Sequence, residues 1–303
     1  MTANLVFSIL WHDLSRRGAT VLSSPGAVNE GWADTLAAMD LGLRGKTAIV
    51  AAASKGLGKG VARALAGEGA NVVMFSRNPA AIEAAAKEVR ASAPDGVRVV
   101  GLTADVTNLT DLERVVKTTI DTFDAISIVF NNAGGPKPGM FDSLTDEDWY
   151  AAVDLNLMSA IRLTRLCLRH MRHRRWGRVI VSTSSSVKQP IANLMLSNAV
   201  RSATTAWART LSDQVAPDGI TVNCLAPGRI DTERIRQIDE DLAQRQGRTR
   251  EEIEQQSLSA IPLRRYGRPE EFGAAAAFLA SEPAGYITGV TLLVDGGLYR
   301  GTY

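Results

Sequence analysis

An apolar run passes directly into a glycine-rich turn within residues 46–60, which read Lys46-Thr47-Ala48-Ile49-Val50-Ala51-Ala52-Ala53-Ser54-Lys55-Gly56-Leu57-Gly58-Lys59-Gly60. A helix-forming stretch follows and continues to about Gly69. Glycines let the backbone approach a pyrophosphate closely, and the free amide groups that begin a helix point toward it. These residues therefore predict an anion site, although plain tight turns use the same glycine pattern.

Apolar, strand-like runs recur along the chain, with helix-periodic stretches between most of them. They cover residues 71–76, 97–103, 126–131, 178–183, 221–226 and 291–295. Strands that alternate with helices predict a parallel sheet covered on both faces. With the run at 47–51, the sequence predicts an α/β domain whose sheet has about seven strands.

Chemically distinctive residues follow the ends of these runs. Gly56 and Gly58 follow the first run, Arg77 the second, Asp105 the third, and Asn131-Asn132-Ala133-Gly134 the fourth. Ligands of such sheets bind beyond the carboxyl ends of the strands. We therefore expect these residues to meet at one crevice.

Seven motifs in order cover the chain from about Leu41 to Tyr299. They are Ala53-Ser54-Lys55-Gly56-Leu57-Gly58, Asp105-Val106, Asn131-Asn132-Ala133-Gly134, Asp154-Leu155-Asn156, Gly177-Arg178-Val179-Ile180-Val181, Asn223-Cys224-Leu225-Ala226-Pro227-Gly228, and Ile287-Thr288-Gly289 leading to Val294-Asp295-Gly296-Gly297. With these motifs the chain resembles the short-chain dehydrogenase/reductase family. The resemblance implies a single Rossmann-type, doubly wound parallel sheet with helices on both faces and a bound nicotinamide dinucleotide.

The resemblance also implies roles for the residues that hold the dinucleotide. The phosphates would bind at Ser54, Lys55, Gly56, Leu57 and Gly58, the adenine between Asp105 and Val106, the nicotinamide ribose at Asn132, Ala133 and Gly134, and the carboxamide at Ile230 and Thr232. The chain departs from the family at Ala52, where the family usually has the first glycine of the turn. We expect the alanine methyl group to fit while it tightens that wall of the site.

The end of the second strand indicates which dinucleotide is used. A carboxylate there would bind the ribose diol and repel a 2′-phosphate, but this chain has Ser76 and Arg77, with Lys55 in the glycine turn. A hydroxyl group and two cations suit a phosphate, so we predict NADP(H) in preference to NAD. The alternative is that Arg77 and Lys55 are ordinary solvated cations.

The catalytic positions carry the main departure from the family. The resemblance places the carbonyl-holding serine at Ser184 and the asparagine that anchors a water chain at Asn156. The family has a proton-donating tyrosine thirteen residues after that serine and a lysine four residues later; this chain has Ser197 and Arg201. Residues four apart share a helix face, so both side chains are expected to face the crevice.

Ser197 and Arg201 cannot copy the proton transfer of a tyrosine and a lysine. A phenol with a pKa near 10 can be brought toward neutrality by a neighbouring cation, whereas an aliphatic hydroxyl cannot, and arginine stays protonated. Arg201 would still hold the ribose and stabilise a developing alkoxide. The proton would come from water or from Lys188, whose alternative is a solvated loop lysine.

Two functions remain open from the sequence. The first is an NADP(H)-dependent oxidoreductase acting on a carbonyl/alcohol pair by reducing a ketone or aldehyde, including 3-oxoacyl-type substrates. The second is a catalytically silent NADP(H)-binding regulatory or scaffold protein on a reductase fold. Retention of Asn132, Asn156, Ser184 and Thr232 favours the enzyme.

Composition and charge narrow the expected partners. The net charge of +2 argues against a nucleic-acid partner, and two cysteines, Cys167 and Cys224, offer no disulfide framework, so we expect a reducing cytoplasm. The basic segment 169–175 contains His170 and His173, but it ends a predicted helix, where cations face water; we expect no metal site there. Predicted helices over about 146–175 and 193–215 carry apolar surface that favours a homodimer or homotetramer.

The ends of the resemblance define the expected domains. Residues 41–303 would form the NADP-binding reductase-like domain, with a charged, helix-prone substrate lid over about 233–262. Residues 1–40 would be a flexible N-terminal extension, or residues 1–38 would reflect an upstream start. The apolar run at residues 5–11 is too short to cross a bilayer, and we expect no membrane association.

Overall fold

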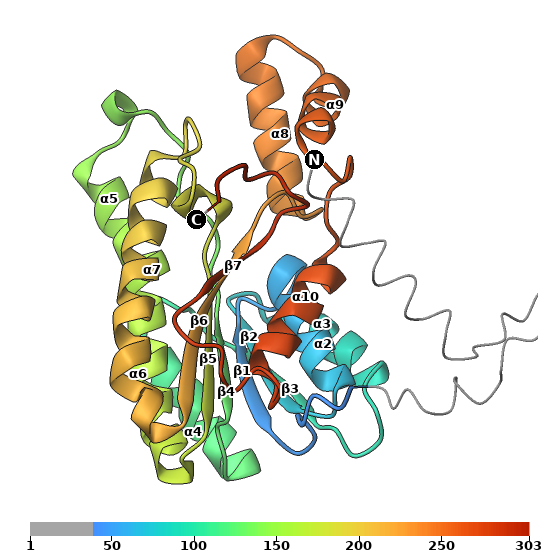
Figure 1. Ribbon diagram of the computed structural model, residues 1–303, viewed down its shortest axis with the longest axis vertical. Coiled ribbons are helices and arrows are strands. Elements are labelled where there is room, and N and C mark those ends of the chain that lie inside the picture. The colour runs from blue at the N-terminus through green and yellow to red at the C-terminus, as the bar shows by residue number, and fades with distance from the viewer. Residues whose placement is uncertain (1–38, 303) are drawn as a thin grey trace, which may run out of the picture. The chain divides into compact units, whose positions relative to one another are not determined.

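A seven-stranded sheet organises the part of the chain that the computed structural model describes, residues 39–302 (Figure 1). All neighbouring strands are parallel, in the order β3-β2-β1-β4-β5-β6-β7. The strands are β1 (Thr47–Ala51), β2 (Asn71–Ser76), β3 (Val99–Thr103), β4 (Ile128–Asn131), β5 (Gly177–Ser182), β6 (Ile220–Pro227) and β7 (Thr291–Val294). This confirms the predicted doubly wound α/β fold. The expected N-terminal extension over residues 1–38 lies outside the described residues.

Helices cover both faces of the sheet (Figure 1). One layer holds α2 (Gly56–Gly67), α3 (Pro79–Ala91) and α10 (Pro269–Ala280), and the other holds α4 (Leu109–Phe123), α6 (Ser159–Arg174) and α7 (Met195–Val215). Successive β1 residues alternate between the two cores, since Val50 belongs to the cluster with Phe272 and Ile49 to the cluster with Leu163. Burial on both faces explains why the strands read as continuous apolar runs rather than as alternating ones.

The predicted long helix over residues 146–175 is interrupted. It consists of α5 (Asp146–Val153), a π-helical turn (Asp154–Met158) and α6, so one extra residue enters the helical ladder in its first half. Short 3₁₀ turns lie at Phe141–Ser143, Ser185–Val187 and Ala216–Asp218. π-helical turns of this kind commonly mark functional sites, because they turn a side chain away from its regular helical direction.

The expected lid is a helical pair, α8 (Glu233–Gln246) and α9 (Arg250–Ala260). Thr249 begins α9 with a capping box, in which its side chain and that of Glu252 each bind the other's backbone amide. Helix α8 begins directly after Thr232, a residue of the expected dinucleotide site. The lid is therefore joined at its first turn to the predicted crevice.

None of the helices within residues 39–302 combines the length and the apolar character needed to cross a bilayer.

Candidate active site

The glycine turn lies at the point where the strand order reverses, between β1 and β4. Its backbone fits a phosphate: Lys55 precedes α2 without a side-chain cap, and the first turn of that helix has no acidic residue. Gly56 has a left-handed φ of 56°, and a Cβ at Gly58 would lie 2.4 Å from the Ala52 carbonyl oxygen. The uncapped amide groups and the close backbone approach are the features by which such turns bind a pyrophosphate.

Ser54 and Leu57, the other predicted phosphate ligands of this turn, differ in how their side chains are placed. Ser54 is half-buried, while Leu57 packs its side chain against the core and contributes only backbone to the turn. Ala52, at the position of the usual glycine, has a φ of 50°. The methyl group is thus accommodated in a conformation that alanine rarely adopts.

The end of β2 offers a hydroxyl group and a cation for a 2′-phosphate. The Ser76 Oγ is buried and has no hydrogen-bond partner, and Arg77 is exposed and has no ion-pair partner among residues 39–302. Lys55 instead forms an ion pair with Glu233 on the first turn of α8. Lys55 is thus engaged by α8, whereas the Ser76 Oγ and Arg77 have no partner among residues 39–302.

The remaining predicted dinucleotide ligands follow β3, β4 and β6. Asp105 accepts hydrogen bonds from the Thr107 amide and hydroxyl, at 2.9 and 2.8 Å, which fixes the turn that Val106 occupies. The Asn132 Nδ2 lies 3.4 Å from the Ala51 carbonyl oxygen and so ties the end of β4 to the end of β1. Ala133 and Gly134 continue the loop after Asn132, where Ala133 is half-buried and Gly134 is exposed.

Ile230 and Thr232, after β6, take mainly structural positions. Ile230 is buried and pairs through its backbone with Gly267. The Thr232 hydroxyl accepts from the Ile235 amide at 3.4 Å as the N-cap of α8, and its Cγ2 would lie 3.4 Å from a Cβ at Gly56. Thr232 therefore faces the glycine turn across the crevice.

Asn156 lies within the π-helical turn and is buried. Its Nδ2 donates to the Gly134 carbonyl at 2.9 Å, and its own backbone carbonyl accepts from the Thr204 hydroxyl at 3.2 Å. The Oδ1 has no partner among the described residues. A buried, unpaired amide oxygen at this place is the acceptor that an anchored water needs.

Arg201 binds the last residue of β5, and Ser184 binds the backbone just after that strand. Ser184 precedes the turn Ser185–Val187, and its Oγ accepts from the Ser186 amide at 3.1 Å. Arg201 Nη1 donates to the Ser182 carbonyl at 3.0 Å. Ser197 and Arg201, four residues apart on α7, are each 8% exposed, so both are turned inward as the register predicted.

Lys188 is exposed and follows the same turn after β5. Its side chain has no ion-pair partner among residues 39–302, while its backbone amide donates to the Ser185 carbonyl at 3.0 Å. Its exposure fits the solvated loop lysine that was the alternative to a catalytic acid.

Arg234 belongs to the site and was missed by the sequence reading. It lies on the first turn of α8, and its Nη2 donates to the Pro136 carbonyl at 3.1 Å. Burial and, to a smaller extent, the neighbouring charge of Arg234 together lower the pKa of the Arg201 guanidinium to about 10. The sequence signal that could have identified Arg234 is its position, two residues after Thr232 and at the start of the expected lid.

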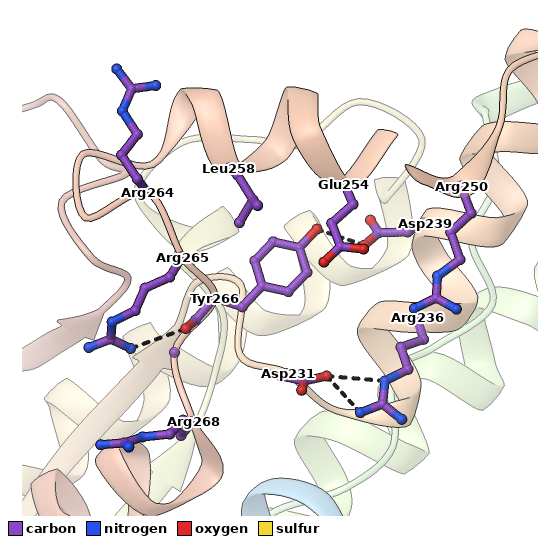
Figure 2. Close-up of a pocket in the computed structure, with 11 residues that line it drawn as sticks. Asp231, Arg236, Asp239, Arg250, Glu254, Leu258, Arg264, Arg265, Tyr266 and Arg268 are labelled. Atoms are coloured by element: carbon purple, nitrogen blue, oxygen red, sulfur yellow. Dashed lines mark hydrogen bonds and ion pairs between the residues drawn. The ribbon is translucent and has the colours of Figure 1, made fainter. Parts of the chain in front are cut away.

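A separate cavity of about 440 Å³ lies behind the lid, between α8, α9 and the segment Arg264–Arg268 (Figure 2). The Tyr266 ring stands in its centre and its hydroxyl donates to Asp239 at 2.8 Å. Four of its five arginines form ion pairs, and Arg264 points away from the cavity (Figure 2). The pairs are Arg236 with Asp231, Arg250 with Glu240, and Arg265 and Arg268 with Glu271. This cavity holds a polar network that ties the lid to the domain.

The basic end of α6 behaves as a solvated helix terminus. Arg172 pairs with Asp218 at 3.0 Å and Arg174 with Asp124 at 3.2 Å, while Arg169 Nε donates to His170 Nε2 at 3.0 Å. Within residues 39–302, no group of three or more His, Cys, Asp or Glu side chains is placed to hold a metal ion.

Known proteins resemble this chain over most of its length. Residues 51–299 match the family described as Enoyl-(Acyl carrier protein) reductase. The 3-oxoacyl-[acyl-carrier-protein] reductase FabG of Vibrio cholerae is 34% identical over 261 residues, which are 86% of this chain and 99% of that protein. The NADPH-dependent reductase BacG of Bacillus subtilis is 33% identical over 83% of this chain and 97% of its own length.

The solved structure of another reductase is similar to this chain. L-sorbose reductase from Gluconobacter frateurii, in complex with NADPH and L-sorbose, superposes with a TM-score of 0.81 at 31% identity, covering 87% of this chain and all of that one. The residues that match the family model, 51–299, include the glycine turn, the π-helical turn and helices α8 and α9. Sequence, sheet order and site geometry together place this chain in the short-chain dehydrogenase/reductase family.

Proposed function

We propose that this protein is an NADPH-dependent oxidoreductase that reduces a ketone or aldehyde, with 3-oxoacyl compounds as the first class to test. The observation that carries the proposal is the meeting of two features at one edge of the sheet. An uncapped helix N-terminus follows β1, and Ser184, Arg201 and Asn156 gather beyond β4 and β5. Relatives named as NADPH-dependent and 3-oxoacyl reductases support it.

The chain's own residues account for cofactor binding. The α2 amide groups and Gly56 and Gly58 would bind the pyrophosphate, and Ser76 with Arg77 would bind the 2′-phosphate. When bound, NADPH supplies the hydride that reduces the carbonyl carbon and is itself oxidised to NADP⁺. The unsatisfied Ser76 hydroxyl is the observation that favours a phosphate there over a bare ribose.

We propose that Ser197 and Arg201 occupy the positions of the family's tyrosine and lysine. Ser184 then holds the carbonyl oxygen, and the fixed charge of Arg201 stabilises the negative charge that develops on it. Water anchored at Asn156 delivers the proton, since Ser197 cannot ionise at neutral pH and Lys188 is exposed. Loss of a positioned acid costs about 10²–10⁴ in rate, so turnover is expected to be slow.

Stopped-flow oxidation of NADPH with ketones, aldehydes and quinones tests this assignment. Ser184→Ala should lower kcat/KM by at least about tenfold, because the carbonyl is no longer held. Lys188→Ala should leave kcat unchanged if water is the donor, and a fall of about 10²–10⁴ would assign the proton to the lysine.

The silent binding protein is the competing function, and the lack of an ionisable hydroxyl at Ser197 favours it. It would be established if the parent binds NADPH tightly and reduces none of these compounds, while the double change Ser197→Tyr with Arg201→Lys creates activity.

We further propose a homodimer or homotetramer in the cytoplasm. Phe278 and Leu292 are each 37% exposed, and Leu292 lies on the edge strand β7, so apolar surface remains for a second copy. Both cysteines are free and buried, as suits a reducing compartment. Light scattering at micromolar concentration should give at least twice the monomer mass.

A further inference from the structure

Two arginines lie close enough at the crevice to interact electrostatically, Arg201 on α7 and Arg234 on the first turn of α8. The Arg201 side chain is 92% buried from solvent, with 8% exposed, yet its only hydrogen bond among the described residues goes to the Ser182 carbonyl. Neither Arg201 nor Arg234 forms an ion pair within residues 39–302. A guanidinium offers five donor groups, so most of the capacity of Arg201 stays unused.

Arg234 reaches from the lid to the loop after β4. Its Nη2 donates to the Pro136 carbonyl, and its Nε and Nη2 would each lie 3.0 Å from a Cβ at Gly135. A glycine at position 135 is therefore what admits the guanidinium against this backbone. Arg234 thus lies against the loop that follows β4, next to Gly134, whose carbonyl binds Asn156.

Three acidic residues on or just before α8, the helix that carries Arg234, are already engaged. Glu233 pairs with Lys55, Asp231 with Arg236 at 2.9 Å, and the buried Asp239 with Arg229. Two like charges in a largely buried place repel each other, and each loses hydration without a protein anion in return. The arrangement becomes favourable when an anion enters from outside and is held by both side chains.

We propose that Arg201 and Arg234 bind a carboxylate of the substrate, so that the substrate is a free oxo acid whose carbonyl lies at Ser184. This proposal rests on the proposed function and names its substrate class. The cofactor phosphates have their own sites after β1 and β2, whereas the two arginines lie beyond β4 and β5. A thioester of the same acyl group carries no charge beside its carbonyl and would leave the pair unneutralised.

Binding can be measured without turnover, because NADP⁺ cannot reduce a ketone. In the presence of saturating NADP⁺, titration calorimetry should show acetoacetate binding at least tenfold more tightly than methyl acetoacetate, with pyruvate and methyl pyruvate as a second pair. Arg234→Met should abolish this preference and leave the NADP⁺ affinity within twofold. Arg236→Met is the matched control, since Arg236 lies on the same helix but pairs with Asp231, and it should keep the preference.

The possible outcomes distinguish a substrate carboxylate from a cofactor phosphate as the anion that the arginines bind. Equal affinities for acid and ester in both pairs would overturn the proposal. A tenfold loss of NADP⁺ affinity in Arg234→Met, with the acid preference unchanged, would assign the arginine to a cofactor phosphate and also overturn it. Rapid NADPH-dependent reduction of the esters together with equal binding would refute the oxo-acid assignment alone, whereas arginine-dependent acid binding with no reduction of any carbonyl would refute the proposed function.

Discussion

Ala52 shows how a single residue stores strain at the cofactor turn. Its φ of 50° lies in the left-handed region, where an L-residue with a Cβ is disfavoured by roughly 1–2 kcal/mol. The sequence identified the departure from glycine here, but the backbone angle could only come from the structure. The strain is tolerated because the Ala53 amide bonds to the Phe75 carbonyl and fixes the turn at the end of β1.

We therefore expect Ala52→Gly to stabilise the protein by about 0.5–1 kcal/mol, since glycine adopts this conformation without strain but loses more chain entropy on folding. Urea unfolding measures the difference. Ala53→Gly is the control: Ala53 is buried and has no left-handed φ, so the same loss of a methyl group should destabilise there. A destabilised Ala52→Gly protein would contradict the strain argument.

Arg77 should decide between the two cofactors. It follows the buried, unpaired Ser76 hydroxyl and has no ion-pair partner among the described residues. We expect NADPH to bind at least about tenfold more tightly than NADH in the parent, and Arg77→Asp to reverse the order through repulsion of the 2′-phosphate. Lys55→Ala should have the smaller effect because Lys55 is paired with Glu233. Calorimetry that gives equal affinities of the parent protein for NADPH and NADH would contradict a 2′-phosphate site at Ser76 and Arg77.

The register of side chains within one helix follows from the sequence, whereas side-chain contacts between distant segments do not. The register of Ser197 and Arg201 was predictable because residues four apart share a helix face. The engagement of Lys55 by Glu233 and the approach of Arg234 to Gly135 were not, because they join segments about 100 to 180 residues apart. Long-range side-chain contacts depend on the final packing of the lid.

At the scale of elements, two glycines set the distance between α2 and α10. A Cβ at Gly60 would lie 2.4 Å from the Pro269 carbonyl oxygen, and one at Gly273 would lie 2.4 Å from the Gly60 carbonyl oxygen. Because these obstacles are backbone atoms, a side chain at either position must push the helices apart. Gly60→Ala should cost about 1–3 kcal/mol of unfolding free energy in urea.

Gly67 provides the control within the same helix. A Cβ there meets nothing within 4 Å, so Gly67→Ala should be neutral or stabilise by up to about 1 kcal/mol through helix propensity. Equal costs for the two substitutions would show that helix propensity, and not the close helix contact, governs this element.

Glu271 ties the start of α10 to the segment before it. Arg265 binds both of its carboxylate oxygens, at 2.6 and 2.8 Å, and the Arg268 amide donates to it at 2.7 Å. These hydrogen bonds, that from Arg265 first, lower the pKa of Glu271 to about 2. A lowered pKa stabilises the fold above the ordinary value of 4.5, and this contribution is lost as the pH falls from there toward 2.

Glu271→Gln should therefore destabilise the protein by about 1 kcal/mol at pH 7, a value reduced by solvent screening, and the difference should shrink as the pH approaches 2. Urea unfolding at a series of pH values measures it. Glu270→Gln serves as the control, because Glu270 reaches Arg63 only at 3.9 Å and should change little. A difference that is independent of pH would exclude the ion pair as its cause.

Element types were predictable from the sequence, while their irregularities were not. Apolar runs identified all seven strands to within about two residues, because strands buried on both faces need continuous apolar sequence. The sequence predicts ordinary helix where the π-helical turn Asp154–Met158 lies, since one extra residue hardly alters the apolar period. That turn presents Asn156, so the missed irregularity lies within the site.

At the scale of the whole molecule, the strand order explains why distant motifs form one site. The chain moves outward from β1 to β3 and then crosses back to β4, so the ends of β1 and β4 lie side by side. The glycine turn follows the first of these strands, and the loop that Asn156 binds follows the second. Position at the switch point was predictable from alternating strands and helices. The chemistry beyond it depends on individual side chains that the fold alone does not determine.

Transfer of a labelled hydride tests the central claim, NADPH-dependent carbonyl reduction, most directly. NADPH deuterated at C4 would be incubated with the protein and acetoacetate or methyl acetoacetate, and the alcohol product analysed by mass spectrometry and NMR. We predict one deuterium per product molecule, on the carbinol carbon, and at least about a tenfold slower transfer with Ser184→Ala. Tight NADPH binding with no deuterium in any product, across ketones and aldehydes, would contradict the reductase and identify a binding protein on a reductase fold.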